Sequence, residues 1–449
     1  MRQPNFSHFR SKKILVLGLG LHGGGAGTVR FFAEQGARLT VTDLRSKSEL
    51  YSSLKALKNI KGITYILGRH RKKDILAADL IIKNPGVRPD SPYLGLARKN
   101  NIPVTTDIGI FFNYAPATII GVTGTRGKST TAYLIWKFLQ KRRPESRVYL
   151  GGNIRKSVLE FLSKTRKGDI VILELSSFQL ADLAQEKKSP QIAVFTNLYQ
   201  DHLNWHKSMI EYARAKSVIF KFQKPGDYLF ANPYDSKVRQ LARTAPSRVI
   251  FPRISAALKK ITDKNLGSHY GPSVALAIAV AKHYGVPVSA IDKVLENFHG
   301  LEQRQQKIAV IQGVTFINDT TATSPDAAVA ALARFRRIAG KNRLILIGGG
   351  QDKNLDFKRF IAEIREKADA VVFLPGTATT KIKYQISKIK NINTEIKKVN
   401  SMKEAVKTAY RLARKGDYII LSPGAASFGL FLNEFDRGKQ FLKAVKKLK

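Results

Sequence analysis

The chain has 449 residues, of which 43% are hydrophobic and 24% are charged, the proportions of a globular protein, which exclude disorder throughout. The absence of cysteine excludes a disulfide scaffold, a cysteine-ligated zinc site and thiol catalysis. The 77 Lys and Arg against 33 Asp and Glu give a formal net charge of +44, which attracts nucleic acid, anionic lipid or phosphorylated substrates. Because the N-terminus is polar and no apolar run approaches about 20 residues, we expect a cytoplasmic protein without a membrane span.

Short apolar runs alternate with amphipathic stretches of helical length along the chain. The runs that predict strands are Ile14–Leu17, Leu39–Thr42, Leu80–Ile82, Thr118–Val122, Ile170–Leu173, Ile192–Phe195, Leu344–Ile347, Ala370–Leu374 and Tyr418–Leu421. Continuous apolar strands separated by helices are typical of parallel sheets, so we predict an α/β fold. New strand–glycine turns near Phe112–Ala117 and His299–Arg304 predict three domains, 1–112, 113–302 and 303–449. The third begins with a hairpin-like pair, Ile308–Ile311 and Thr315–Asn318.

The first glycine-rich turn, Gly18–Gly23, follows a predicted strand and opens a helix, and Asp43 ends the next strand. Glycines allow close backbone approach, and a helix N-terminus attracts a pyrophosphate. The pattern matches the dinucleotide fingerprint, but such a turn accepts any nucleotide diphosphate. It therefore predicts nucleotide binding without selecting NAD.

A second glycine-rich loop, Gly121–Thr130, reads GVTGTRGKST between a predicted strand and the predicted helix Thr131–Gln140. Backbone N–H groups of such a loop surround phosphates, Lys128 reaches the terminal ones, and the Ser129 hydroxyl can ligate Mg²⁺. The spacing departs from a strict P-loop, because Val122 occupies the position of its first glycine. The loop indicates a site for a nucleoside triphosphate.

Two further strand ends in the central part carry polar groups. Glu174 directly follows the strand Ile170–Leu173, where ligands of open α/β sheets bind, and it is well placed to hold Mg²⁺ directly or through water. The pair Asp201-His202 follows the strand Ile192–Phe195 and can bind a hard metal ion or orient phosphate. Lys216 follows on an amphipathic helix, where the sequence by itself marks it as one lysine among many.

The last third of the chain has three strand-end loops rich in hydroxyl groups and glycine: Asn318–Thr323, Gly348–Lys353 and Ser422–Phe428. Carboxyl ends of parallel strands meet at one edge of a sheet, so these loops point to a single binding edge. Together they suggest a site for an anionic group, with Lys353 as the counter-charge.

In this order the motifs resemble those of the Mur ligase family, and most closely its D-glutamate-adding branch. GVTGTRGKSTT is shared by Mur ligases and folylpolyglutamate synthases, whereas ELSSFQL followed by NLYQDHLNWH, and LSPGAASFGLF followed by NEFDRG, resemble this branch. The resemblance implies a Rossmann-like domain for the UDP moiety, a central P-loop-type ATPase domain and a Rossmann-like C-terminal domain that binds the amino acid. It implies a ligase of peptidoglycan precursor synthesis that adds D-glutamate to UDP-N-acetylmuramoyl-L-alanine through an acyl phosphate made with ATP.

The resemblance also implies roles for individual residues. Lys128 would contact the ATP phosphates, Ser129 and Glu174 would bind one Mg²⁺, and His202 would bind a second, with Lys216 as a further metal ligand if carbamylated. The residues implied in ATP binding are Gly124, Thr125, Arg126, Gly127, Lys128, Ser129, Thr130, Arg304 and Asp319. Those implied in binding the UDP substrate are Gly20, Leu21, His22, Asp43, Arg45 and Asn153, and those implied in binding the amino acid are Thr323, Lys353 and Ser427.

Three alternatives accompany this interpretation. Thr321 replaces a lysine of the family and Glu434 an aromatic residue, which leaves open a sister ligase that adds another amino acid. The charge of +44 suggests a nucleic-acid-binding protein, but the cations are spread along the chain, so we expect nonspecific anion binding and no specific nucleic acid. An NAD-dependent dehydrogenase would leave the second loop, Glu174 and His202 unexplained. We expect a monomer.

Overall fold

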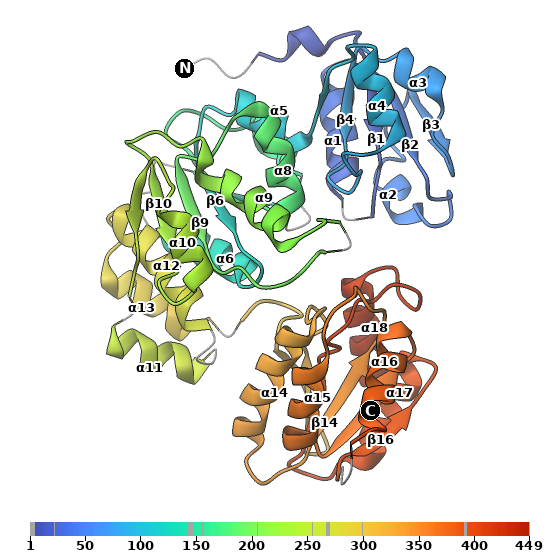
Figure 1. The fold of residues 1–449 in the computed structure, drawn as a ribbon, viewed down its shortest axis with the longest axis vertical. Coiled ribbons are helices and arrows are strands. Elements are labelled where there is room, and N and C mark those ends of the chain that lie inside the picture. The colour runs from blue at the N-terminus through green and yellow to red at the C-terminus, as the bar shows by residue number, and fades with distance from the viewer. Residues whose placement is uncertain are drawn as a thin grey trace. The chain divides into compact units, whose positions relative to one another are not determined.

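The computed structural model describes residues 5–21, 23–141, 147–153, 157–203, 205–253, 255–265, 270–298, 300–389 and 393–448 (Figure 1). His22, one of the residues implied in substrate binding, lies outside the described residues. The contacts divide the chain into two compact units: Met1–Tyr199 with Lys207–Lys259 and Tyr270–Val294, and Gln200–His206 with Lys260–His269 and Leu295–Lys449. Among the described helices, none combines the length and apolar composition that crossing a membrane requires.

The first sheet of the first unit is parallel throughout its described strands. Their order is β3 (Ile63–Leu67), β2 (Arg38–Asp43), β1 (Lys13–Leu17), β4 (Leu80–Lys83) and β5 (Val104–Thr105). The helical segments are η1 (Ser7–Phe9), α1 (Gly24–Glu34), α2 (Tyr51–Lys55), α3 (Lys72–Leu76), α4 (Pro92–Lys99) and α5 (Asp107–Tyr114). Because strand residues alternate between faces, Ile14 and Val16 share a core with α1, whereas Leu15 and Leu17 pack with α3 and α4. The strand order reverses between β1 and β4, the switch point where such sheets bind ligands.

A second parallel sheet belongs to the same unit. Its described strands follow the order β11 (Arg248–Ile250), β10 (Tyr228–Ala231), β9 (Ile192–Phe195), β6 (Thr118–Thr123), β8 (Ile170–Glu174) and β7 (Val148–Gly152). The helices are α6 (Lys128–Leu139), α7 (Leu159–Leu162), α8 (Ser177–Glu186), α9 (Met209–Lys221), α10 (Ser236–Ala242), α11 (Ala256–Asn265), α12 (Gly271–His283) and α13 (Val288–Glu296). Strands β8 and β9 are buried along their whole length, as expected for central strands covered on both faces.

A buried ion pair links the two sheets of the first unit. Lys83, at the end of β4, places Nζ 2.8 Å from Asp182 Oδ2 on α8, and both side chains are almost completely buried. Burial raises the pKa of Asp182 to about 6, because the charged carboxylate loses its water, and Lys83 opposes that shift. Glu186, also on α8, accepts hydrogen bonds from the Thr105 hydroxyl at 2.7 Å and from the Asn113 amide at 3.1 Å. The N-terminal sheet is thus attached to α8 by charge and hydrogen bonds.

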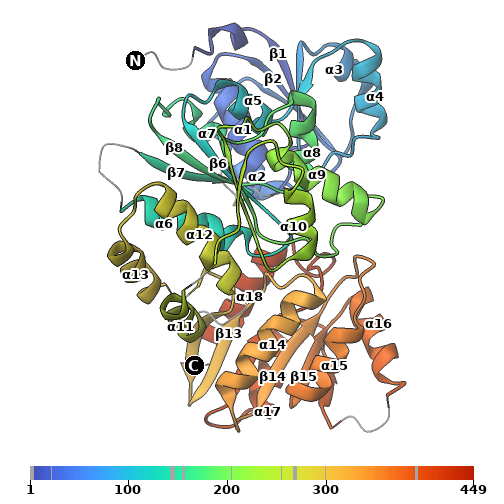
Figure 2. The ribbon, with the colours of Figure 1, turned by 60° about the vertical axis from the view of Figure 1, so that its left-hand side comes forward.

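The second unit contains a mixed sheet. Its described strands follow the order β12 (Gln306–Ile311), β13 (Val314–Asn318), β17 (Tyr418–Leu421), β14 (Leu344–Gly349), β15 (Ala370–Leu374) and β16 (Glu395–Lys398), with only β12 antiparallel to its neighbour. The helices are α14 (Pro325–Ala339), α15 (Lys358–Lys367), α16 (Thr377–Ile386), α17 (Met402–Leu412) and α18 (Glu434–Lys446). Helices α14 and α15 lie side by side, and with α16 they share one core with the sheet (Figure 2). Helices α17 and α18 contribute to the core on its other face.

The predicted α/β fold is confirmed. All nine apolar runs form strands, and the expected hairpin is present as β12 and β13. The prediction did not include β3, β5, β7, β10, β11 or β16. Of these, β16 reads Glu-Ile-Lys-Lys, because an edge strand pairs on one side only and can stay polar. The limits 1–112, 113–302 and 303–449 remain our proposed domain boundaries.

Candidate functional site

The loop between β6 and α6 requires glycine at two positions. Gly124 has φ +144° and Gly127 has φ +78°, which side chains other than glycine rarely adopt. A Cβ atom at Gly124 would overlap the Thr196 hydroxyl, and one at Gly127 would overlap the Ser273 hydroxyl. Helix α6 begins directly after Gly127, so its N-terminal N–H groups and positive dipole end face the loop. This is the geometry of a phosphate-binding loop.

The residues that follow β9 hold this loop in shape. Asn197 Oδ1 accepts the N–H of Arg126 at 2.7 Å, and Asn197 Nδ2 donates to the Arg126 carbonyl at 3.0 Å. The N–H of Thr125 donates to the Asn197 carbonyl at 2.9 Å. The next residue, Leu198, donates its N–H to Asp235 Oδ2 at 2.9 Å. The motif that starts at Asn197 therefore supports the loop through its first residue, a role that the sequence analysis did not assign.

Two predicted catalytic lysines meet at one carbonyl oxygen of the loop. Lys128 Nζ donates to Gly124 O at 3.0 Å and to Thr125 O at 3.1 Å. Lys216 Nζ, on α9, donates to the same Gly124 O at 2.8 Å and lies 4.7 Å from the ring centroid of Tyr212. Lys216 is only 1% exposed, which separates it from the many solvated lysines of this chain. Two cations at a phosphate loop match the charge of a nucleoside triphosphate; carbamylation of Lys216 remains a prediction.

Glu174 fits the predicted role of a magnesium ligand. It ends β8, pairs in register with Val122 of β6 and is 2% exposed. Its Oε1 accepts a hydrogen bond from Asn153 Nδ2 at 3.0 Å, while its Oε2 is buried without a hydrogen-bond partner among the described residues. An unpaired buried carboxylate oxygen is costly unless a cation or a donor satisfies it. This hydrogen bond places Asn153, which is implied in substrate binding, beside Glu174.

No group of three or more His, Asp or Glu side chains that could hold a metal ion occurs within the described part of the chain. Mg²⁺ usually binds through one or two carboxylates together with phosphate oxygens and water. Glu174 beside the phosphate loop therefore fits Mg²⁺ carried by a nucleotide. Ser129, the second residue of α6, belongs to the same helix start.

The first glycine-rich turn is built around Asp43. Its carboxylate accepts the N–H of Gly20 at 2.9 Å and the N–H of Arg45 at 2.9 Å, and Asp43 is 3% exposed. The Ser53 hydroxyl donates to Gly20 O at 2.7 Å. A Cβ atom at Gly20 would lie 3.1 Å from the amide nitrogen of Asn84, which follows β4. The sequence analysis did not select Asn84; its signal is the Asn-Pro-Gly turn after a predicted strand at the switch point.

In the second unit, Asp319 lies at the carboxyl end of the sheet. Its Oδ2 accepts the Ser422 hydroxyl at 2.8 Å and its Oδ1 accepts the N–H of Gln305 at 3.1 Å. Burial raises the pKa of the Asp319 carboxyl to about 7, and the nearby Arg304 and Arg334 guanidinium groups oppose that shift. Asp319 and Arg304, both implied in ATP binding, are thus electrostatically coupled.

The three predicted amino-acid contacts belong to this unit. Thr323 follows β13 and donates its N–H to Thr321 O at 2.9 Å, and Ser427 is buried after β17. Lys353 follows β14 and places Nζ 3.7 Å from Asp201 Oδ1, with only 15% of its side chain exposed. All three follow different strands of the sheet, as the prediction of one binding edge requires.

His202 is grouped with the second unit by the contacts of Gln200–His206. Its N–H donates to Asp201 Oδ1 at 2.9 Å, and its backbone has φ 55°, a conformation that non-glycine residues seldom adopt. Strained backbone of this kind is common at functional sites. Its place as a ligand of a second metal ion stays a prediction.

Arg437 is a central residue that the sequence analysis quoted within NEFDRG but did not select. It is completely buried, and its guanidinium donates to Thr320 Oγ1 at 3.1 Å, Thr320 O at 2.7 Å and Ala425 O at 3.1 Å. Burial lowers its pKa to about 9, opposed by Glu434 and Asp319. Arg437 thus fastens the loop after β13 to the loop after β17.

Replacing Gly124 with alanine is expected to weaken ATP binding about tenfold or more. The backbone strain alone costs about 1–3 kcal/mol, and 1.4 kcal/mol is a factor of ten in affinity. Isothermal titration with ATP measures the effect. Gly226→Ala is the matched control, because nothing lies within 4 Å of a Cβ there and no positive φ is required. Equal ATP affinity in the two variants would contradict the importance of this loop shape.

Replacing Asp319 with asparagine is expected to make stability less dependent on pH. The folded carboxyl binds its proton more tightly than the unfolded one, whose pKa is near 3.8, so stability declines as pH rises from about 4 to about 7. The neutral isostere avoids that loss. Thermal unfolding should give Asp319→Asn a higher melting temperature than the unmodified chain at pH 8, and a similar one at pH 4. A difference that stays constant between these pH values would refute the buried-charge explanation.

Family models match the chain in the order that its three sheets follow. The Mur ligase MurD-like N-terminal domain matches residues 12–106, the Mur ligase middle domain matches 122–289, and the Mur ligase glutamate ligase domain matches 303–424. The chain belongs to the Mur ligase family, as its motifs predicted.

The relatives make the relationship more specific. A UDP-N-acetylmuramoylalanine–D-glutamate ligase from Roseiflexus sp. (strain RS-1) is 37% identical, and the match covers 97% of this chain and 98% of that protein. A ligase of the same name from Borreliella afzelii (strain PKo) is 36% identical over the same shares. Among solved structures, a MurF ligase from Thermotoga maritima in complex with ADP matches with a TM-score of 0.58 at 16% identity, covering 99% of this chain and 97% of that one. E. coli FolC in complex with DHPP and ADP matches with a TM-score of 0.56 at 18% identity, covering 76% and 94%. These structures support the fold.

Proposed function

We propose that this chain is an ATP-dependent ligase that joins D-glutamate to UDP-N-acetylmuramoyl-L-alanine in cytoplasmic peptidoglycan precursor synthesis, acting as a monomer. The chemistry rests on one observation: Lys128 and Lys216 both donate to Gly124 O of the phosphate loop. The strand next to this loop ends in Glu174, which is buried. The relatives at 37% and 36% identity support the choice of substrates.

The reaction forms an acyl phosphate. The substrate carboxylate attacks the γ-phosphorus of ATP and ADP leaves; the amine of D-glutamate then attacks the acyl carbon and phosphate leaves. Positioning and charge neutralisation do most of the work in phosphoryl transfer. Lys128 and the N–H groups at the start of α6 would hold the phosphates, while Glu174 and Ser129 would hold Mg²⁺. When bound, Mg²⁺ supplies further neutralisation of the phosphate oxygens.

The C-terminal sheet would receive the amino acid and the ribose. Lys353 offers a cation to a substrate carboxylate, and Thr323 and Ser427 offer hydroxyl groups. Asp319 would accept a ribose hydroxyl. Thr321 donates its hydroxyl to Gln303 O at 3.3 Å, and the Glu434 carbonyl accepts the Thr320 hydroxyl at 2.6 Å. Neither contact distinguishes D-glutamate from another amino acid, and the experiment below makes that distinction.

The test is phosphate release with Mg-ATP and UDP-N-acetylmuramoyl-L-alanine, in parallel reactions with D-glutamate, L-glutamate, D-aspartate, L-lysine or no amino acid. We expect release to depend on D-glutamate, with a product of the mass of the D-glutamyl adduct. Dependence on another amino acid would keep the mechanism and replace the proposed substrate. No release under any condition, from folded protein that binds ATP, would refute the proposed function.

A further inference from the structure

The outer sides of α17 and α18 carry positive charge that the proposed ligase reaction does not use. The two helices pack against each other and turn Met402, Val406 and Phe441 into the core. Their outer sides and the adjoining loop residues expose nine cations, which we call the α17–α18 basic face: Lys403, Lys407, Arg411, Arg414, Lys415, Lys439, Lys443, Lys446 and Lys447.

Within the described residues, none of these nine cations forms an ion pair. The exposed acid between them, Glu404, accepts the N–H of Asn400 at 2.8 Å. The opposite side of the sheet differs, because acids neutralise cations there. Its ion pairs include Arg336–Asp369 at 2.8 Å, Lys367–Glu363 at 2.8 Å and Lys381–Asp352 at 3.0 Å. Both sides are basic, and the opposite side also has exposed cations outside these ion pairs, among them Lys358, Arg359, Lys383 and Lys388. The α17–α18 basic face differs in that none of its nine cations is ion-paired among the described residues.

The spacing of the cations is unfavourable for the helices themselves. Lys403, Lys407 and Arg411 are four residues apart on α17, as are Lys439 and Lys443 on α18, and like charges at this spacing repel each other. The helix dipole favours cations in a last turn, which accounts for Arg411 on α17 and for Lys443 and Lys446 on α18. It does not account for Lys403 or Lys407 in the first half of α17. A bound polyanion would convert this repulsion into attraction.

We propose that the α17–α18 basic face binds the phosphate backbone of nucleic acid without sequence preference. A fixed row of cations gains affinity by releasing counterions from closely spaced phosphates. A membrane surface fits less well, because helices that lie on membranes also present exposed aromatic or aliphatic side chains. Among the described residues, the large hydrophobic side chains that are exposed include none on α17 or α18.

This face leaves the predicted amino-acid loops accessible. In parallel α/β units the helices run antiparallel to the strands, so the C-terminal ends of α17 and α18 lie at the amino edge of the sheet. Asp319, Ser427 and Lys353 lie in loops at its carboxyl edge. Nucleic acid bound through Lys443, Lys446 and Arg414 is therefore compatible with ligase activity.

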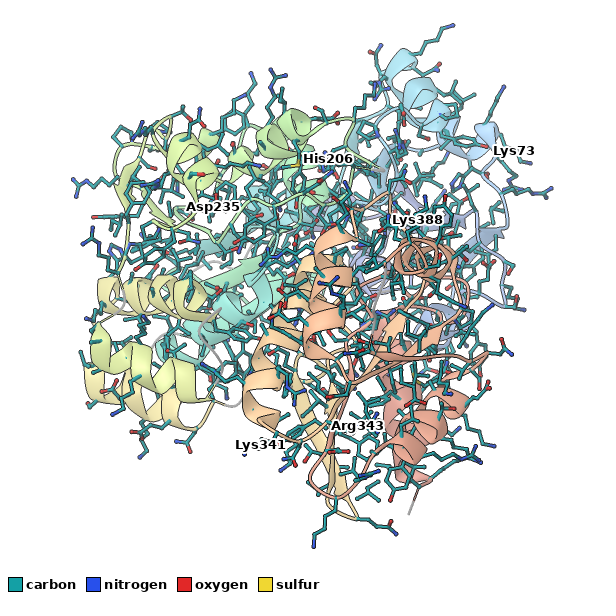
Figure 3. The ribbon with its side chains drawn as sticks, turned by 60° about the horizontal axis from the view of Figure 1, so that its bottom comes forward. Lys73, His206, Asp235, Lys341, Arg343 and Lys388 are labelled. Carbon is teal, nitrogen blue, oxygen red and sulfur yellow. The ribbon has the colours of Figure 1, made fainter. Side chains whose placement is uncertain are left out.

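The test measures binding of the full chain to a labelled 20-base-pair DNA duplex by fluorescence anisotropy over a series of salt concentrations. The test variant replaces Lys403, Lys407, Lys443 and Lys446 with glutamine. The control variant replaces Lys358, Arg359, Lys383 and Lys388 with glutamine. These are exposed cations of α15, of α16 and of the turn just after α16, where Figure 3 labels Lys388, and these helices share the core on the opposite side of the sheet. Each variant lowers the net charge of +44 by four. Phosphate release should be unchanged in both, and neither variant should have a lower melting temperature than the unmodified chain.

We expect the test variant to lose about tenfold or more in affinity at 150 mM salt, and its salt slope to fall by about 3 to 4, since each lost phosphate contact removes about 0.9. The control variant should change affinity by less than about threefold. Equal losses in both variants would overturn the proposal, because overall charge would then suffice. No binding by the unmodified chain, or tighter binding to phosphatidylglycerol vesicles than to DNA, would overturn it as well.

Discussion

Replacing Lys128 with alanine is expected to lower ATP-dependent product formation by about 10³-fold, the cost of losing a fixed charge aimed at a transferring group. The Lys128 ammonium lies at the phosphate loop, 3.0 Å from Gly124 O and 3.1 Å from Thr125 O. In the reaction it would neutralise charge that builds up on the transferring phosphoryl group, so kcat should fall more than ATP affinity. Phosphate release at saturating ATP, with ATP binding by titration, separates these two effects.

The matched control for this variant is Lys137→Ala. Lys137 lies on the same helix, α6, where its Nζ is 4.9 Å from the ring centroid of Trp136, away from the phosphate loop. Its replacement should leave the rate within about twofold, as expected for a lysine outside the site. Full activity of Lys128→Ala would remove the central element of the proposed function.

Replacing Arg437 with methionine is expected to lower the free energy of unfolding by about 3 kcal/mol. The guanidinium satisfies Thr320 O and Ala425 O in a completely buried place, and each buried carbonyl left without a donor costs about 1–3 kcal/mol. Removing the buried charge offsets part of this cost, since burial lowers the pKa of Arg437 to about 9. Chemical denaturation monitored by circular dichroism measures the change.

Arg411→Met serves as the control for this prediction, because Arg411 is an exposed arginine of α17. A surface replacement usually changes stability by less than about 0.5 kcal/mol. Equal stability of the two variants would show that the hydrogen bonds of Arg437 contribute little, and that the loops after β13 and β17 are held by other contacts.

The site residues that could be predicted are those that lie within a local sequence motif. Lys128 follows a glycine loop between an apolar strand and a helix, and Glu174 ends the next predicted strand, so the pattern places both at a sheet edge. Asn84 and Arg437 were not predicted. Asn84 lies beside Gly18 and Gly20, which follow another strand, and its only local signal is the Asn-Pro-Gly turn. Arg437 is distinguished by complete burial, which has no local sequence signal.

The sequence by itself determined the α/β fold and the phosphate loop. Apolar runs specify buried strands, and glycines permit the positive φ angles that the loop requires. Only the tertiary structure decided how cations outside the glycine loop, such as Lys216 and Arg437, are placed. Lys216 reaches Gly124 O across 92 residues, and Arg437 reaches Thr320 across 117. Burial and hydrogen-bond partners distinguish a lysine or arginine of the site from one on the surface. Both depend on the order of the strands in each sheet. In a chain with a net charge of +44, this distinction separates the catalytic candidates from the solvated surface.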